Sequence, residues 1–351
     1  MKRLMVMAGV AAAVFATPAT AQEYNFNMAT IVPETSFYYQ MFTIPFVENV
    51  EKLTQGRVKI QPYGGGVLAP ALKVHEAVQD GIVELGHTTP IYIVNQAVEN
   101  SLFGAHPGGM DGPALMGWYY QGGGLELLQE QRREKMNLHS LLTGIGPTEV
   151  FAHSHVPIRT ADDLKNLKFR AGGAWGNILQ DVFGAVPTTV PGSEIYTMLE
   201  RKAIDAAEFS TVGDNMTFGF EQAAPYTVVP GVHVNAFAFE VVMKPETWDA
   251  LPDDIKAALE AAAQITTLQS YLAWTKADLE AIGKIEAAGK PEIVRLSDEL
   301  IDQVTVASRD WATKRAQEEG GKGNDWMQRV TDSYYDFADQ WSKASAFRPK
   351  S

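Results

Sequence analysis

Strands and helices alternate between Pro157 and Phe209, and this alternation constrains the fold of the chain more than any other feature. A strand is predicted from Leu167 to Ala171, and the helix that follows it ends at Gly184. A second strand, a second helix and a third strand complete the stretch. Such alternation is typical of an α/β fold with a parallel sheet, in which ligands bind beyond the carboxyl ends of the strands.

Arg170 lies near the end of the first of these strands, before Gly172 and Gly173. An arginine is costly to bury unless it is paired, and its planar fork of donors suits a carboxylate. The two glycines would let a ligand approach the backbone. A salt bridge inside the domain is the alternative explanation, and the residues alone leave both open.

A similar alternation begins at Tyr24. One of its strands ends at Thr88 and Thr89, which places two hydroxyl groups where they could bind a ligand. Helix capping or turn formation explains these threonines equally well. The run from Asp253 to Ile282 contains neither glycine nor proline, which predicts a helix of roughly 45 Å that could brace two domains.

The chain has 351 residues, of which 46% are hydrophobic, so it is long enough for two domains. Its formal net charge of −13 argues against a nucleic-acid partner. It has no cysteine, which excludes disulfides, metal thiolates and thiol nucleophiles. The HExxH and GxSxG motifs are missing, and no catalytic triad is evident by spacing, so an enzyme is not expected.

The first residues have the pattern of a secretory signal. Lys2 and Arg3 precede an apolar run from Leu4 to Ala16, and small residues follow from Ala19 to Ala21. The run is shorter than the roughly 20 apolar residues that span a bilayer. Cleavage after residue 21 would leave a soluble periplasmic protein.

Four segments resemble the extracytoplasmic solute receptors of TRAP transporters: "PIRTADDLKNLKFR", "AGGAW", "EIYTMLERKAIDAAE" and "WDALPDDIKAALEAAA". The resemblance covers roughly Tyr24 to Gly289. It implies an α/β, two-lobed periplasmic binding protein fold, type II-like, with a long helix that braces both lobes. It also implies capture of an organic acid in the interlobe cleft, with Arg170 on its carboxylate, and delivery to a TRAP membrane permease.

Within this family, "GGAW", "AAEF" and "YYQGGGLELLQ" are most similar to the branch that receives 2-oxo and 2-hydroxy acids. That branch implies a Na⁺ or Ca²⁺ ion that bridges to the ligand and is held by Glu208 and Phe209. It commonly supplies a glutamine where this chain offers Thr148 or Glu149, and an acid where this chain has Val234. Because of these departures, the sequence leaves open whether this chain binds a cation.

The expected organisation is a signal peptide (1–21), lobe I (22–147 with 236–275), lobe II (148–235 with 276–319) and a C-terminal helix (320–351). The candidate ligand-binding residues are Arg170, Glu149, Thr89, Trp175, Glu208, Phe209, Asn215 and Asn235. The aromatic residues leave room for a larger aromatic or dicarboxylic acid. A secreted binding protein without a transport role is a further alternative.

Two other features have competing explanations. His153 and His155 share one strand face and could bind a metal, but no third ligand has a suitable spacing, so a surface or turn role is favoured. After the glycines at 320–323, five large residues form one stripe on a predicted helix: Trp326, Val330, Tyr334, Phe337 and Trp341. This stripe must be covered, either by the chain's own body or by a second copy in a homodimer.

Overall fold

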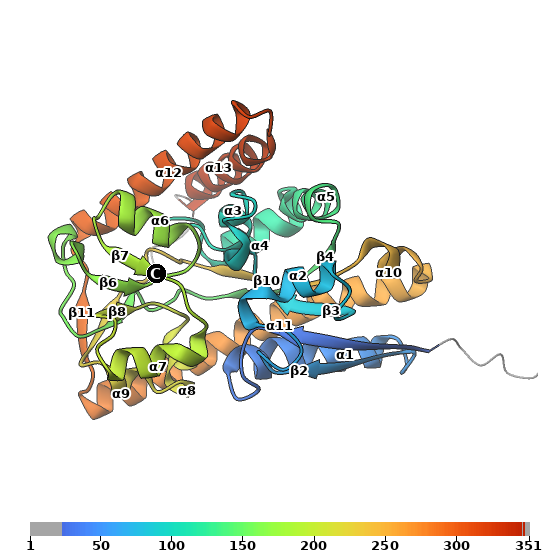
Figure 1. Ribbon diagram of the computed structural model, residues 1–351, viewed down its shortest axis with the longest axis horizontal. Coiled ribbons are helices and arrows are strands. Elements are labelled where there is room, and N and C mark those ends of the chain that lie inside the picture. The colour runs from blue at the N-terminus through green and yellow to red at the C-terminus, as the bar shows by residue number, and fades with distance from the viewer. Residues whose placement is uncertain (1–22, 346, 348–351) are drawn as a thin grey trace, which may run out of the picture.

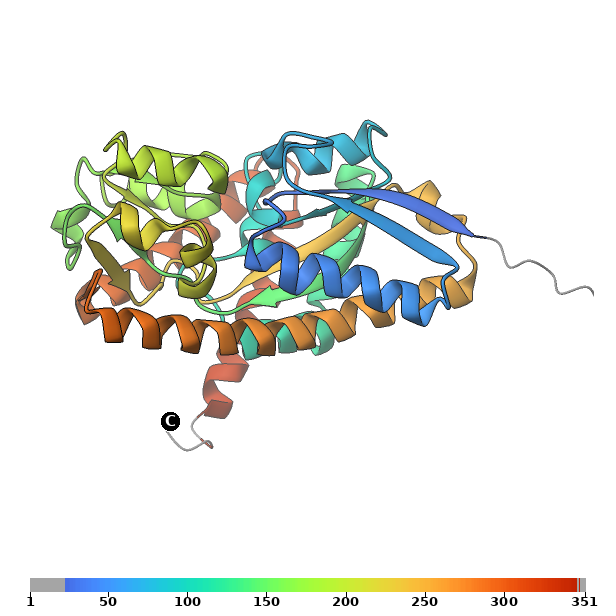
Figure 2. The ribbon, with the colours of Figure 1, turned by 90° about the horizontal axis from the view of Figure 1, so that it is seen from below.

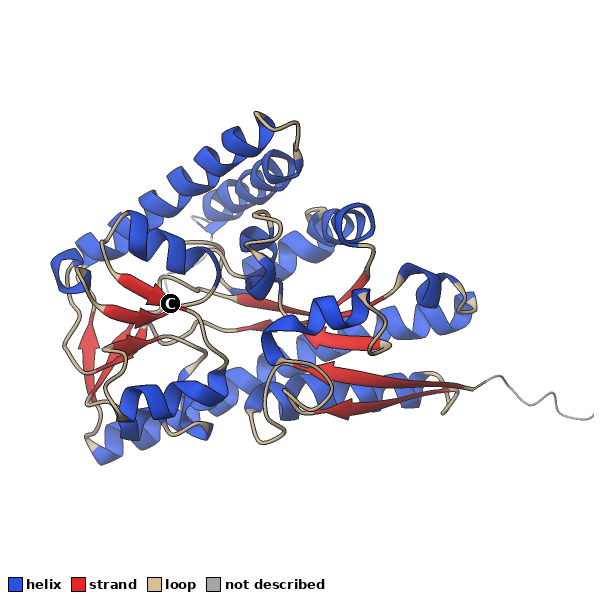
Figure 3. Cartoon of the chain, viewed as in Figure 1, coloured by secondary structure: helices blue, strands red, loops and turns tan. Residues whose placement is uncertain are grey.

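The computed structural model describes residues 23–345 and 347, so the predicted signal segment lies outside the described residues. Two β-sheets organise the chain, each with helices packed around it, and they define two lobes (Figures 1 and 3). We call the part around the five-stranded sheet lobe I and the part around the six-stranded sheet lobe II.

The sheet of lobe I has the strand order β2-β1-β3-β10-β4. Its strands are β1 (Tyr24–Thr30), β2 (Val58–Tyr63), β3 (Leu85–Thr88), β4 (His139–Gly146) and β10 (Phe237–Met243). β1 pairs in parallel with β2 and β3, as the alternation predicts. β10 is antiparallel to both of its neighbours, because it enters the sheet after the chain has returned from lobe II.

The sheet of lobe II has the strand order β11-β9-β5-β8-β6-β7. Its strands are β5 (Ala152–Ser154), β6 (Lys168–Arg170), β7 (Val186–Thr188), β8 (Ala206–Ala207), β9 (Tyr226–Val229) and β11 (Glu292–Arg295). The three strands predicted between Pro157 and Phe209 are therefore β6, β7 and β8. β6 lies between β7 and β8 and is parallel to both, so their carboxyl ends meet at one edge.

Helices cover these sheets. In lobe I they are α1 (Ile44–Leu53), α2 (Val74–Gln79), α3 (Asn100–Gly104), α4 (Gly112–Gln121), α5 (Gly124–Met136) and α10 (Pro245–Asp249). In lobe II they are α6 (Gly173–Asp181), α7 (Gly192–Glu200), α8 (Val212–Thr217) and α9 (Phe220–Ala223). Short non-α turns occupy Tyr39–Thr43, Ala71–Lys73, Pro90–Ile93 and Ala161–Leu164.

The long helix α11 (Asp253–Ala288) runs beneath both lobes (Figure 2). Its first half packs on α1 and β4 of lobe I, and α8 of lobe II also packs on it. The sequence predicted its end at Ile282, but the helix continues to Ala288 because Gly283 is tolerated inside it. It ends at Gly289, whose φ of 63° is left-handed and favours glycine.

The chain ends in a pair of helices, α12 (Asp298–Gly320) and α13 (Trp326–Ser345), that pack on each other. α13 also contacts α3, α4 and α5 of the same chain (Figure 1). Trp326, Val330 and Tyr334 of the predicted stripe are buried there. Between α4 and α5, a side chain at Gly122 would lie 2.6 Å from the ring of Phe337, so glycine permits this close packing.

In the described residues, no helix is both long enough and apolar enough to cross a membrane.

Candidate functional site

A cavity lies between the two lobes, and both contribute to its lining. Lobe II contributes Arg170 and Glu208, which are neighbours because β6 and β8 pair in parallel with Arg170 opposite Ala207. Lobe I contributes Thr89, directly after β3, and α11 contributes Trp274. The apolar part of the lining includes Ile31, Val32, Val234, Phe237 and Phe239. The cavity thus combines an ionic wall with an apolar wall.

Arg170 is buried, and hydrogen bonds within lobe II fix its guanidinium. Its Nη1 donates to the backbone oxygen of Glu208 at 2.7 Å and lies 3.2 Å from Oε2 of the Glu208 carboxylate. Nε and Nη2 both donate to the backbone oxygen of Val190. The ring of Phe209 lies 5.3 Å from the guanidinium carbon. The salt bridge that the sequence left open therefore exists, and it is part of the cavity wall.

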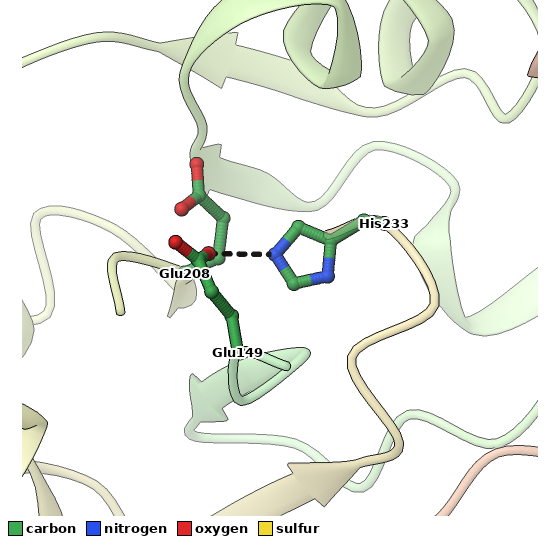
Figure 4. Close-up of side chains that lie close together, drawn as sticks. All are labelled: Glu149, Glu208 and His233. Atoms are coloured by element: carbon green, nitrogen blue, oxygen red, sulfur yellow. Dashed lines mark ion pairs between the residues drawn. The ribbon is translucent and has the colours of Figure 1, made fainter. Parts of the chain in front are cut away.

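Glu208, Glu149 and His233 converge on one point of the cavity (Figure 4). One potential ligand atom from each lies within 4.8 Å of the other two. Glu208 is oriented by Gly172, whose backbone N–H donates to Oε1 at 2.5 Å. His233 Nε2 lies 3.4 Å from Glu149 Oε2, yet neither atom has a hydrogen-bond partner in the part of the chain that the structure describes.

Burial changes the protonation of this cluster. The pKa of Glu149 lies well above its usual range, because the carboxyl is desolvated and because Glu208 stands nearby. Burial also raises the pKa of Glu208, although Arg170 and the Gly172 N–H oppose the shift. Burial, helped by Arg170, lowers the pKa of His233 to about 3, so its ring is neutral. Two carboxylates and a neutral imidazole can hold a cation, so the residues fit one.

Two further donors face the same cavity. Trp175 Nε1 and the Tyr38 hydroxyl are buried and lack a hydrogen-bond partner among residues 23–345 and 347. A buried donor without a partner costs free energy, so each is suited to a ligand oxygen. Thr89 also lines the cavity, but its hydroxyl accepts from the backbone N–H of Ile91, as expected of a capping threonine.

The structure brings six of the eight candidate residues to the cavity: Arg170, Glu149, Thr89, Trp175, Glu208 and Phe209. It does not bring the other two. Asn215 is buried beneath the wall, where Nδ2 donates to the backbone oxygen of Ser210. Asn235 donates to the backbone oxygen of Gly109 and so fastens the crossing between the lobes. Both asparagine side chains donate to backbone oxygens instead of entering the cavity. Their positions in the sequence placed them near the cleft but did not determine the direction of their side chains.

Sequence reasoning missed His233, Tyr92 and Asp214, which also line the cavity. His233 directly precedes Val234, where an acid was sought and not found. His153, for which a surface or turn role was expected, is instead buried in β5, and its ring contacts Asn215 and Thr227 inside lobe II.

Comparison with known proteins gives consistent matches. The family model of bacterial extracellular solute-binding proteins, family 7, matches residues 28–318. A monocarboxylate 2-oxoacid-binding periplasmic protein of Nostoc sp. is 31% identical over 266 residues, which are 75% of this chain and 71% of that protein.

Solved structures agree. A TRAP transporter solute-binding protein from Bordetella bronchiseptica, with copurified calcium and picolinate, superposes with a TM-score of 0.87 and 25% identity. The match covers 93% of this chain and 95% of that one. A TRAP periplasmic solute-binding protein from Pseudoalteromonas atlantica, with sodium and pyruvate, superposes with a TM-score of 0.86 and 23% identity. That match covers 93% of this chain and 97% of the other. The predicted two-lobed fold and family resemblance are thereby confirmed.

Proposed function

The chain belongs to family 7 of the bacterial extracellular solute-binding proteins, and we propose that it captures a small 2-oxo or 2-hydroxy monocarboxylate together with a cation. The members of this family are periplasmic solute receptors, and they work with TRAP permeases. The family is not a class of enzymes. The ligand site is the cavity between the lobes, and the membrane partner is the permease.

The observation that carries the proposal is the set of donors in the cavity. The Arg170 guanidinium supplies the positive charge, and Trp175 Nε1 and the Tyr38 hydroxyl are buried without partners among the described residues. A carboxylate has enough lone pairs to satisfy all three groups. A purely structural protein would gain nothing from leaving such donors unsatisfied inside an enclosed cleft.

Charge balance explains why a cation should accompany the ligand. Among the described residues that line the cavity, Arg170 is the only permanent cation, whereas Glu149, Glu208 and Asp214 are acids. With these acids ionised, the wall repels a second anion, and burial makes the repulsion strong. Either protons or a metal ion must offset the charge. The partnerless oxygen of Glu149 favours a metal ion, which would polarise and orient the ligand oxygens it touches.

The size of the cavity selects among the ligand alternatives. Its volume is about 50 Å³, and a water molecule needs about 10–15 Å³ on this measure. A three- or four-carbon acid fits this space better than the larger aromatic or dicarboxylic acids considered from the sequence. The apolar wall would contact the short tail of such an acid.

A homodimer is not needed to cover α13, because Trp326 and Tyr334 are already buried within the same chain. A homodimer formed by exchange of α13 would have to reproduce the same burial between two copies. The dimer mentioned for the Bordetella bronchiseptica protein is a property of that protein.

Ligand-induced stabilisation tests the proposal. Protein stripped of metal by a chelator is unfolded thermally with pyruvate, lactate, 2-oxobutyrate, picolinate or succinate, each with and without added cations. A ligand at a thousand times its dissociation constant should stabilise the fold by about 4 kcal/mol. We expect this effect for the short monocarboxylates in the presence of a cation. Stabilisation by succinate alone would indicate the dicarboxylate alternative, and no effect of any carboxylate would refute the proposal.

A further inference from the structure

His233 is the unusual member of the candidate cation cluster. Its ring is fully buried and is packed against the rings of Phe151 and Trp175, with centroids 5.3 and 5.7 Å away. Neither ring nitrogen has a hydrogen-bond partner within the described part of the chain. Aromatic packing therefore fixes the position of the imidazole, and Nε2 lies 3.4 Å from Glu149 Oε2 without a hydrogen bond between them.

The direction of the ring shows what the polar atoms could contact. Nε2 points toward the carboxylates of Glu149 and Glu208 (Figure 4). A neutral imidazole has a lone pair on one nitrogen, and no protein partner dictates which nitrogen carries the proton. Nε2 is thus free to act as a ligand beside two carboxylate oxygens.

We propose, building on the proposed function, that this receptor selects a borderline divalent transition-metal ion of the zinc type, held by Glu149, Glu208 and His233. The relatives described above hold sodium or calcium. Calcium takes six to eight oxygen ligands, whereas imidazole suits zinc, iron, copper and nickel. A site with one nitrogen among three protein ligands therefore favours the second group. The transported species would be a metal chelate of the acid.

Ligand number and charge agree with this choice. Three protein ligands leave room for the two oxygens that a 2-oxo or 2-hydroxy acid can offer, and zinc accepts four or five ligands. Glu149, Glu208, Asp214, Arg170 and a monocarboxylate together carry three net negative charges when the acids are ionised. A divalent ion offsets two of these charges, whereas sodium offsets only one.

Calorimetric titration of metal-stripped protein with Zn²⁺, Ca²⁺ or Na⁺, each with saturating pyruvate, tests the selectivity. We expect one zinc ion per chain and a clear preference for zinc over calcium. His233→Gln replaces the nitrogen with an amide oxygen, so it should weaken zinc binding by about tenfold or more and leave calcium binding unchanged or improved. His155→Gln is the matched control, because His155 lies in the same lobe and its Nε2 contacts the backbone oxygen of Leu199.

A spectroscopic measurement on the native protein does not depend on the folding of any variant. Co²⁺ in place of zinc should give a visible absorption spectrum of low coordination number, and Cu²⁺ should show nitrogen coupling in its electron paramagnetic resonance. A lack of nitrogen coupling, or calcium binding as tight as zinc binding, would overturn this inference. Pyruvate binding with calcium or sodium alone would still leave the receptor function intact. Absence of carboxylate binding with every cation would instead refute the proposed function.

Discussion

Arg170 is oriented before any ligand arrives. Both the side-chain carboxylate and the backbone oxygen of Glu208 contact its Nη1, and the Val190 backbone oxygen accepts from Nε and Nη2. These contacts reduce the entropy that the side chain would lose on binding. The same guanidinium therefore stabilises the wall of the cavity and lines the space that a ligand would occupy.

Replacement of Arg170 by lysine should therefore weaken binding although the charge remains. A lysine cannot reach Val190 and Glu208 together, because it lacks the planar fork of donors. We expect a loss of at least about 2 kcal/mol in affinity for pyruvate, measured by titration calorimetry. Arg159→Lys is the control, since Arg159 is in the same lobe with its side chain 53% exposed. Near-native affinity of Arg170→Lys would remove this residue from the binding site.

Asp278 is a buried acid with a structural role. Its Oδ1 accepts from the Thr211 hydroxyl at 2.6 Å and from the Gly213 N–H at 2.8 Å, which joins α11 to the start of α8. Burial raises its pKa to about 6, and nearby Asp214 adds to the shift. The folded chain thus retains a proton at pH values where the unfolded chain, with an ordinary carboxyl, has lost it.

The stability of the protein should depend on pH through Asp278. Its folded pKa is above the unfolded value of 3.8, so the stabilisation is complete below pH 3.8 and is lost as the pH rises through 6. Asparagine resembles the protonated form, and Asp278→Asn should be more stable than the native chain at pH 7 by up to about 3 kcal/mol.

Urea unfolding of both chains at several pH values measures the difference, which should approach zero near pH 4. Glu286→Gln, on an exposed position of α11, makes the same charge change as a control. A constant difference between pH 4 and pH 7 would contradict the assignment to Asp278.

At the scale of elements, a buried ion pair fastens α5 to β10. Arg132 and Glu240 are both fully buried, with Nη2 and Oε1 separated by 2.7 Å. Glu240 also accepts from the Ser140 hydroxyl and contacts His75 Nε2. Arg132 holds the pKa of Glu240 well below its usual range, although burial alone would raise it. The carboxylate is therefore ionised and depends on its partners.

Arg132→Met should destabilise the fold by about 3–5 kcal/mol, because it leaves the Glu240 charge buried with too few partners. Arg133 provides a matched control on the next position of α5. Its pair with Asp249 is exposed, so Arg133→Met should cost no more than about 1 kcal/mol. The double variant Arg132→Met with Glu240→Gln should recover part of the loss. Equal effects of the two single arginine variants in denaturant unfolding would contradict this account.

Local pattern was sufficient to predict many elements. Strand-helix alternation predicted β6, β7 and β8, and the absence of glycine and proline predicted most of α11. Ser297 caps α12, since its hydroxyl accepts from the N–H of Leu300. The end of α11 was wrong by six residues, because packing tolerates a glycine that local propensity disfavours.

The candidate site was only partly predictable. Arg170 was found because it ends a strand of a predicted parallel sheet, and Glu208 was found through the family resemblance. Glu149 and His233 come from the two crossings between the lobes, far apart in sequence, and their approach depends on how the lobes dock. Periodicity carries no information on that docking, and it cannot reveal that the nitrogens of His233 lack partners.

At the scale of the whole molecule, α13 closes the surface of lobe I. Trp118 is fully buried beneath it, and its indole Nε1 donates to the Ser333 hydroxyl at 3.0 Å. The Tyr334 hydroxyl accepts from the backbone N–H of Met110 at 2.8 Å. Trp326, Val330 and Tyr334 of the predicted stripe are therefore covered by the chain's own body, whereas Phe337 and Trp341 are only partly buried against it. An exchanged helix would have to reproduce these contacts between two copies.

Removal of residues 324–351 should destabilise the protein without changing its oligomeric state. The deletion exposes the apolar surface around Trp118, and each Å² that returns to water costs about 25 cal/mol, so the total should reach several kcal/mol. Light scattering at micromolar concentration should show a monomer for the full chain, and thermal unfolding should show the loss of stability. Removal of 346–351 alone is the control and should change neither. A full-length dimer that becomes a monomer of unchanged stability on truncation would show instead that α13 belongs to a partner.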